Sequence, residues 1–213
     1  MAGKVLVAAT GKGGAGKSTT IACLALHWHL RGLKVALVDA DPNQTIARWH
    51  AKGDALSAIT LRVEHDEHNI IPTIAELTAT HDRVLVDCAG FSNQVMVFAI
   101  GAADLVLIPV MTDEANVFEA LRTRKMVQSA SALTRRSIPA RTMMSRVKRS
   151  AVASHTRAQL EALGAEPLAA HLADRTVFQE ATFHGSSPEI LAPDSPAAQD
   201  IAALAVEIDA LPW

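Results

Sequence analysis

Short runs of apolar residues alternate along the chain with longer segments in which apolar residues recur at helical spacing. The first pattern is typical of strands buried on both faces, and the second is typical of helices that cover a sheet. The alternation predicts an α/β fold with a doubly wound, mostly parallel sheet flanked by helices. We expect strands at 5–9, 35–38, 60–63, 84–86, 105–110 and 140–144. We expect helices at 18–31, 45–52, 70–80, 94–102, 114–133, 150–163 and 197–210.

Composition indicates one compact domain that spans residues 1–213. The chain is 49% hydrophobic and 20% charged, which is typical of globular proteins, and only 185–196 has the composition of a long loop. A formal net charge of −2 gives no overall attraction to nucleic acid. The two cysteines, Cys23 and Cys88, are too few for a disulfide framework, and no segment is apolar enough to span a bilayer. We therefore expect a cytoplasmic protein.

A glycine-rich turn lies between the first predicted strand and the first predicted helix. This position suits a phosphate-binding loop, because glycines let several backbone N–H groups point at phosphate oxygens beside the positive end of a helix dipole. Lys17 is expected to reach the β- and γ-phosphates of a nucleotide, and the Ser18 hydroxyl to bind Mg²⁺. The predicted nucleotide-binding residues of this loop are Gly11, Lys12, Gly13, Gly14, Ala15, Gly16, Lys17, Ser18 and Thr19.

Two further predicted strands end in carboxylates. Asp39 and Asp41 follow one strand two residues apart, so both lie on one side if the strand continues, and such a pair suggests contact with Mg²⁺ or water. The alternative for Asp39 is a role in capping the following helix. Asp87 ends an apolar strand, the form of a Walker B segment that holds Mg²⁺. Gly90 is expected to present its N–H to the γ-phosphate, because no side chain blocks close approach.

The segment from Lys12 to Thr19, KGGAGKST, resembles the deviant Walker A loop of the ParA/MinD family of dimerising ATPases. In that family the extra lysine, here Lys12, reaches across the dimer to the partner's nucleotide. The resemblance also implies that Asp41 positions the attacking water and that Asp39 supports the outer shell of the metal. The segment 87–90, DCAG, is similar to the family's Asp-x-x-Gly switch. Arg146 stands where the family commonly has an Asn-Arg adenine contact, although Ser145 replaces the asparagine.

This resemblance implies a P-loop ATPase that binds ATP and Mg²⁺ and forms an ATP-dependent homodimer. Hydrolysis would be slow without a partner protein that sits on a cargo. The cargo would be a plasmid, a chromosome region or a protein organelle. We expect no helix-turn-helix extension before Lys4, so a separate partner would have to supply operator binding.

Basic residues are concentrated between positions 120 and 160. This window holds ten of the 20 lysines and arginines and no acidic residue. Such a field predicts sequence-independent contact with DNA phosphates and association with nucleoid DNA, and the alternative is a solvated face balanced by acids from elsewhere in the fold. The predicted DNA-binding residues are Arg122, Arg124, Lys125, Arg135, Arg136, Arg141, Lys148 and Arg149, and the window also contains Arg146 and Arg157.

Two other functions are alternatives to DNA-based positioning, and each requires residues that can be sought in the sequence. A MinD-like membrane cycle requires a basic amphipathic C-terminal helix, but residues 197–213 contain three acids and no lysine or arginine. We therefore expect no membrane partner. A metallocluster protein of the nitrogenase iron-protein type requires cluster ligands, and neither Cys23 nor Cys88 stands in such a pattern. The polar segment 65–68, HDEH, lacks a preformed ligand shell in the sequence.

Overall fold

The computed structural model describes residues 2–91, 93–148 and 150–213. Its centre is a single six-stranded sheet in the order β3-β2-β4-β1-β5-β6. Every strand pair in this sheet is parallel. The strands are β1 (Lys4–Ala8), β2 (Val35–Ala40), β3 (Thr60–Val63), β4 (Arg83–Cys88), β5 (Leu105–Val110) and β6 (Ala140–Met144).

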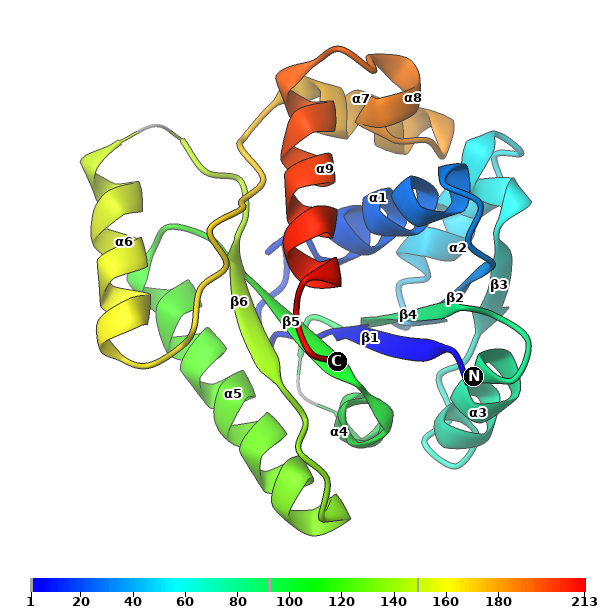
Figure 1. Cartoon of the computed structure of the whole chain (residues 1–213), viewed down its shortest axis with the longest axis horizontal. Helices are drawn as coiled ribbons and strands as arrows, with labels where there is room; N and C mark the ends of the chain where they lie inside the picture. Colours follow the sequence, from blue (N-terminus) through cyan, green and yellow to red (C-terminus); the bar gives the residue numbers. More distant parts are fainter. Residues whose placement is uncertain (1, 92, 149) are drawn as a thin grey trace.

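Helices cover both faces of the sheet, as Figure 1 shows. Apolar side chains from one sheet face pack with α3 (Ile70–Thr78), α4 (Gln94–Ala102), α5 (Glu114–Thr134) and α6 (Ala151–Ala162). Those from the other face pack with α1 (Lys17–Leu30), α2 (Thr45–His50), α7 (Thr176–His184) and α9 (Pro196–Asp209). The short helices η1 (Ala55–Ala58) and α8 (Pro188–Leu191) complete the fold. The predicted doubly wound α/β architecture is therefore confirmed.

Side-chain caps start several of these helices where the sequence predicted a start. Asn93, Asp113, Ser150 and Ser195 each accept a hydrogen bond from the backbone N–H three residues later. Such a cap satisfies one of the backbone donors that a helix start leaves without a partner. Together with buried strands such as β5, in which every residue is buried, the caps account for the close agreement between predicted and observed elements.

The sequence did not reveal α7, α8 or η1. Residues 185–196 were expected to form a loop, but α8 lies within them. Its single turn is too short to show helical periodicity. A usable signal existed for α7, since Gly185 follows it in the left-handed conformation that commonly ends a helix. Of these three helices, α7 lines a cavity beside the glycine-rich loop.

The final helix is held in place by the body of the protein. Its buried residues Ile201, Leu204 and Ile208 belong to the core that α1 shares. The Asp209 carboxylate accepts a hydrogen bond from the Trp28 indole at 3.1 Å and pairs with Arg83 at 3.0 Å. These three apolar residues of α9 are consequently buried against protein.

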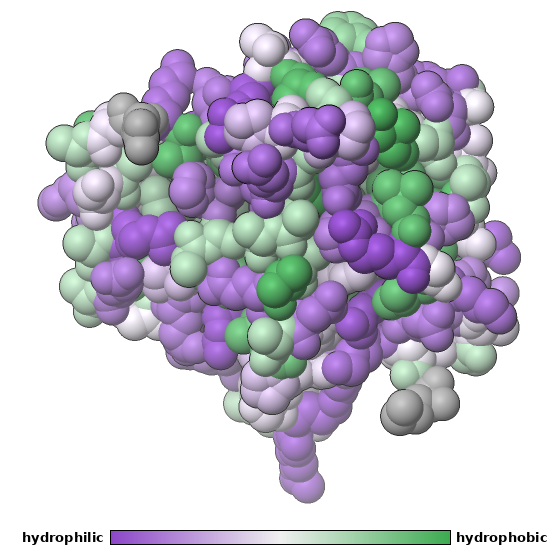
Figure 2. Space-filling model, turned by 45° about the horizontal axis from the view of Figure 1, so that its top comes forward, coloured by the Kyte–Doolittle hydropathy of each residue, from purple (hydrophilic) through white to green (hydrophobic). Residues whose placement is uncertain are grey.

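On the face shown in Figure 2, hydrophilic residues are interspersed with hydrophobic ones, which gather in small separate groups. None of the helices that the structure describes combines the length and the apolar composition that a bilayer crossing requires.

Candidate nucleotide site

The glycine-rich loop connects β1 to the start of α1. Gly14 and Gly16 have φ angles of 79° and 88°, in the left-handed region that favours glycine, and Gly16 caps α1. Gly13 and Gly14 are exposed, and a cavity of about 440 Å³ opens beside them. The loop thus has the strand, turn and helix context of an anion cradle, with backbone N–H groups near a helix N-terminus.

Lys17 is nearly buried and faces this cavity. Its ammonium group donates to the Lys12 carbonyl oxygen at 3.3 Å, and it lines the cavity together with Ser18. Burial lowers the pKa of Lys17, while the carboxylates of Asp87 and Asp41 act in the opposite direction. A phosphate anion in the cavity would add the negative charge that this buried cation lacks.

Asp87, at the end of β4, has unused hydrogen-bonding capacity. It is fully buried, and neither carboxylate oxygen has a hydrogen-bond partner among the described residues. Burial raises the pKa of Asp87 to about 7, and the nearby Ser18 hydroxyl acts against that rise without reaching hydrogen-bond geometry. Buried carboxylates are normally paired or bound to metal, so these two oxygens and the Ser18 hydroxyl fit the oxygen ligand set of Mg²⁺.

Asp39 and Asp41 differ in their surroundings. The two oxygens of Asp39 accept hydrogen bonds from the backbone N–H groups of Asp41 at 3.2 Å and Ala47 at 2.9 Å. Asp39 therefore holds the first turn of α2, as the capping alternative anticipated. Asp41 lines the phosphate cavity, and among the described residues its side chain accepts one hydrogen bond, from the Asn43 N–H at 2.9 Å. Of the two acids, Asp41 is therefore the better placed to bind water in the cavity.

Gly90 brings the segment after β4 against the phosphate loop. A Cβ atom on Gly90 would lie 2.9 Å from the Gly13 Cα and 3.2 Å from its nitrogen, closer than side-chain carbons approach backbone. Only glycine permits this contact without a shift of one segment. Gly90 also lines the phosphate cavity.

Ser145 and Arg146 follow β6 on the same edge of the sheet. The buried Ser145 hydroxyl donates to the Ala15 carbonyl oxygen at 2.7 Å, so it braces the phosphate loop. Sequence reasoning treated Ser145 only as a departure from the family's asparagine and missed this role. Arg146 has a φ of 51° and lines both the phosphate cavity and the neighbouring one.

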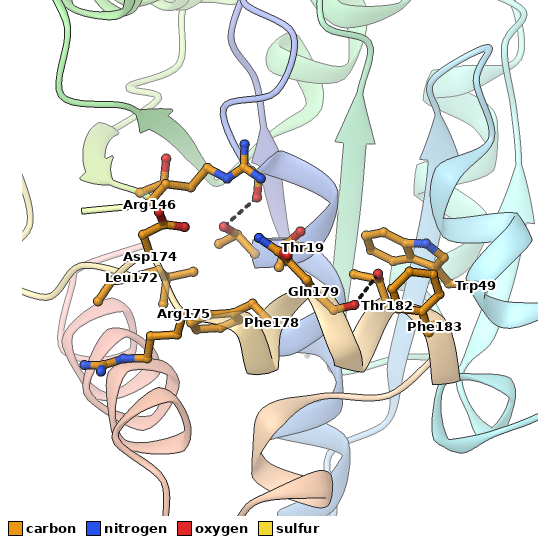
Figure 3. Close-up of a pocket in the computed structure, with 14 residues that line it drawn as sticks. Thr19, Trp49, Arg146, Leu172, Asp174, Arg175, Phe178, Gln179, Thr182 and Phe183 are labelled. Atoms are coloured by element: carbon orange, nitrogen blue, oxygen red, sulfur yellow. Dashed lines mark hydrogen bonds between the residues drawn. The ribbon is translucent and has the colours of Figure 1, made fainter. Parts of the chain in front are cut away.

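The neighbouring cavity, of about 350 Å³, lies beside Thr19 and Arg146 (Figure 3). Aromatic side chains and polar groups from α2, α7 and the segment before α7 line it. They include Trp49, Asp174, Arg175, Phe178, Gln179, Thr182 and Phe183. An aromatic wall beside a phosphate cradle can accept a nucleoside. The sequence did not reveal this wall, because α7, which carries Phe178 and Phe183, was not predicted, and nothing in the predicted helix 45–52 singled out Trp49.

The basic stretch is largely paired with acids from elsewhere in the fold. Glu166 forms ion pairs with both Arg124, at 2.6 Å, and Arg141, at 2.5 Å. The remaining pairs are Arg122–Glu119, Arg136–Asp104 and Lys148–Asp174. Among the described residues of the predicted DNA-binding set, Lys125 and Arg135 have no acidic partner within 4 Å. Arg149 lies outside the described residues.

The residues that the metallocluster alternative would need, and those of the segment 65–68, do not come together at one site. Cys23 and Cys88 are both fully buried and pack in the cores on opposite faces of the sheet. Over 2–91, 93–148 and 150–213, no group of three histidine, cysteine, aspartate or glutamate side chains is placed to hold a metal ion. His65 instead contacts Gln44, at 3.1 Å.

Comparison with known proteins places the chain in a family. The model of the VirC1 protein family matches residues 3–186. A protein named ParA from Rhizobium radiobacter is 31% identical over 177 residues, covering 82% of this chain and 80% of the relative. The carboxysome distribution protein A of Halothiobacillus neapolitanus is 27% identical over 188 residues and 85% of each chain.

Solved structures share the fold. The MinD protein from Pyrococcus horikoshii, complexed with Mg-ADP, superposes with a TM-score of 0.77 at 20% identity, covering 97% of this chain and 96% of that one. A structure of apo McdA from Cyanothece gives the same TM-score at 18% identity, covering 96% of this chain and 99% of that one. The six-stranded parallel sheet and the glycine-rich loop are thus set in a shared architecture. The chain belongs to the VirC1 family, within the ParA/MinD group of positioning ATPases.

Proposed function

We propose that this chain is a Mg²⁺-dependent ATPase that dimerises on ATP, binds DNA without sequence preference and positions a cargo with a partner protein. Lys12 is the observation that carries the proposal. Its side chain is partly exposed, and it has no hydrogen bond or ion pair among the described residues while its carbonyl oxygen holds Lys17. A second chain that met this edge would place its Lys12 beside the phosphates. There the ammonium group would neutralise charge that develops during phosphoryl transfer.

Within one chain, the residues around the phosphate cavity divide into three roles. The loop N–H groups and Lys17 would bind the phosphates. Ser18 and Asp87 would hold Mg²⁺, whose charge would stabilise the phosphate oxygens when it is bound. Asp41 would position water, and Asp39 would act through the backbone that carries Asp41. Arg146 is at the junction of both cavities, where it can contact the nucleoside side of ATP.

DNA binding in this proposal depends on the exposed cations that remain after pairing. Arg135 has no acidic partner within 4 Å in the part of the chain that the structure describes, and the Lys148 side chain is 81% exposed with Asp174 at 3.6 Å. Two chains in one ATP dimer would present these weak sites together, which raises avidity without a new contact. ATP would thereby control association with nucleoid DNA inside the cytoplasm, and hydrolysis stimulated by the partner would release the dimer.

Light scattering after size exclusion tests dimerisation, with a slowly hydrolysed ATP analogue compared with ADP. We expect dimers of the wild-type chain only with the analogue, and monomers of Lys12→Ala. Lys34→Ala is the matched control, because Lys34 is an exposed lysine far from the loop in the fold. Dimerisation of Lys12→Ala equal to wild type would remove the main support for the proposal.

Co-sedimentation with duplex DNA at two salt concentrations tests the second half. The double variant Arg135→Asn, Lys148→Ala should lower affinity and reduce the salt slope by about two. Asparagine is chosen for position 135 because it tolerates the left-handed conformation found there. If the dimer ignores DNA under both salt conditions, the ATPase part stands and the DNA-based mechanism is wrong.

A further inference from the structure

An apolar groove with a cationic end runs between α5 and α6. Two adjoining cavities of about 360 and 370 Å³ form it, and they share Phe118, Leu121 and Leu163. We call this the α5–α6 groove. We propose that the α5–α6 groove binds an amphipathic helical segment of a partner protein, whose apolar side chains enter the groove and whose acidic end lies at Lys125.

The α5 side of the groove is a continuous stripe. The stripe begins at Phe118 and continues three, four and seven positions later with Leu121, Arg122 and Lys125. This spacing places all four residues on one face of the helix. Phe118 is 61% exposed, and Leu163, across the groove, is 49% exposed. Single exposed apolar residues are ordinary, but here two large ones and the half-buried Leu121 line one depression. Burial of this surface by a partner would be favourable.

The charges of the groove are unevenly placed. The cavity toward the middle of α5 is lined by Arg122, Arg124 and Lys125, and the cavity toward its start by Glu114. Lys125 has no acidic partner among the described residues, and Arg122 is paired only with Glu119 on its own helix. An occupant with acids at one end would meet these cations, and its orientation would be fixed by Glu114 at the other end.

The apolar floor favours a protein over DNA as the occupant. Phosphate recognition requires cations and N–H donors but gains little from phenylalanine and leucine. A helix in a groove uses apolar anchors three or four residues apart. Residues 118 to 125 extend over about 10 Å of helix, which matches two turns of an opposing helix. Arg122, Arg124 and Lys125, considered above as DNA contacts, are better explained as the rim of this groove.

The groove is connected to the nucleotide edge by both of its walls. α5 begins four residues after β5 ends there, and α6 begins five residues after Arg146. An occupant could therefore act on the residues that line the nucleotide cavities. This part of the inference rests on the proposed function, since it describes where the stimulating partner docks.

Fluorescence anisotropy with a labelled synthetic peptide tests the inference on the full chain loaded with an ATP analogue. The probe is an amphipathic helix of about four turns, with leucines on one face and glutamates at one end. The comparison peptides have the same residues in scrambled order, or lysine in place of glutamate. We expect saturable binding of the acidic peptide, at least tenfold tighter than either comparison peptide.

Variants locate the binding site. Phe118→Ser and Lys125→Glu should each weaken peptide binding at least fivefold, while Leu133→Ser, at an exposed position toward the other end of α5, and Lys34→Glu, at an exposed position before β2, should leave it unchanged. Binding of a fluorescent ATP analogue, measured in parallel, shows whether a failure lies in the ATPase site instead. Equal binding by Phe118→Ser and wild type would overturn the inference.

Two other results would also overturn it. If Phe118→Ser reduces affinity for duplex DNA as strongly as it reduces peptide binding, the groove is a nucleic-acid surface. If Phe118→Ser prevents ATP-dependent dimerisation in light scattering, the groove is an interface between two copies of this chain.

Discussion

At the phosphate-binding edge, residues from four distant parts of the sequence meet, whereas the basic stretch from 120 to 160 is continuous in sequence and is divided among several partners in space. Gly13, Asp41, Gly90 and Arg146 line one cavity. In the basic stretch, by contrast, Glu166 alone pairs with two arginines. The first region gathers groups with unused binding capacity, and the second uses much of its charge internally.

The two regions show which kinds of sequence pattern predict a functional site. A glycine-rich loop is defined by backbone geometry between neighbouring elements, so the site that it predicts does not depend on what the rest of the fold brings near it. A run of basic residues does not by itself predict an anion-binding surface, because acids that the fold brings near can pair with it. Asp87 is an example of the first case, because its carboxylate oxygens have no hydrogen-bond partner among the described residues. Arg124 is an example of the second, because its guanidinium group is paired with Glu166. Four substitutions test this difference between the phosphate-binding edge and the basic stretch.

Lys17→Ala should have the largest effect. It removes the buried cation beside the phosphate cavity, and loss of charged hydrogen bonds of this kind costs about 3 kcal/mol, or roughly a hundredfold in ATP affinity. Titration with a fluorescent ATP analogue measures it. Lys34→Ala, on the exposed end of the fold, should bind as wild type does. An ATP affinity within a factor of a few of wild type for Lys17→Ala would contradict the assignment of the phosphate loop.

Gly90→Ala should come next. The added methyl group meets the backbone of Gly13 at 2.9 Å, so one of the two segments must move. Such overpacking costs about 2 kcal/mol, and here the cost should appear as weaker nucleotide binding and slower hydrolysis. Gly101→Ala is the control, since its methyl group would meet only a Thr134 methyl at 3.7 Å. If Gly90→Ala retains full ATPase activity, the contact between the two segments has no functional part.

The sequence was sufficient for most of the fold because local signals and global packing agree. β3, β5 and β6 were predicted with the bounds that the structure gives, and α4 likewise. These strands are bounded by charge, glycine or proline, and α4 and α5 start at side-chain caps. α8 escaped because one helical turn carries no periodicity, and its position depends on tertiary contacts such as that between His27 and Glu189 at 3.0 Å.

The candidate site was predictable only in part. The phosphate loop, Asp41, Asp87 and Gly90 were found from motifs, and the structure gathers them in one place. The bracing role of Ser145 and the aromatic wall with Trp49 and Phe178 were not, because contacts between distant segments leave no periodic trace in one sequence. The pairing of the basic stretch was anticipated only as the alternative to DNA binding.

Asp87→Asn should have effects of intermediate size. It should raise the stability of the nucleotide-free chain and lower the stabilisation that Mg²⁺ and nucleotide provide. Replacing a fully buried carboxylate that has no hydrogen-bond partner among the described residues removes a desolvation cost, so the nucleotide-free chain should gain about 1 to 2 kcal/mol of stability. Thermal unfolding measures this gain. The same variant should lose the further stabilisation that Mg²⁺ and nucleotide give to wild type. Asp194→Asn, at an exposed position, should change neither value, and a destabilised Asp87→Asn would show that the carboxylate has a structural role.

Glu166→Gln should have the smallest effect on stability and the most direct bearing on the contrast between the regions. Glu166 is half exposed, so the loss of its pairs with Arg124 and Arg141 should cost under about 1 kcal/mol. The variant leaves two guanidinium groups without their carboxylate. If the basic stretch is a DNA surface held in check by this acid, affinity for duplex DNA should rise and its dependence on salt should steepen, because more phosphates are neutralised. Glu161→Gln on the neighbouring helix supplies the control for a change in net charge alone, since no ion pair involves it among the described residues. Equal DNA affinity for the two variants would mean that these arginines serve the fold, and that any DNA contact must come from cations elsewhere, such as Arg135.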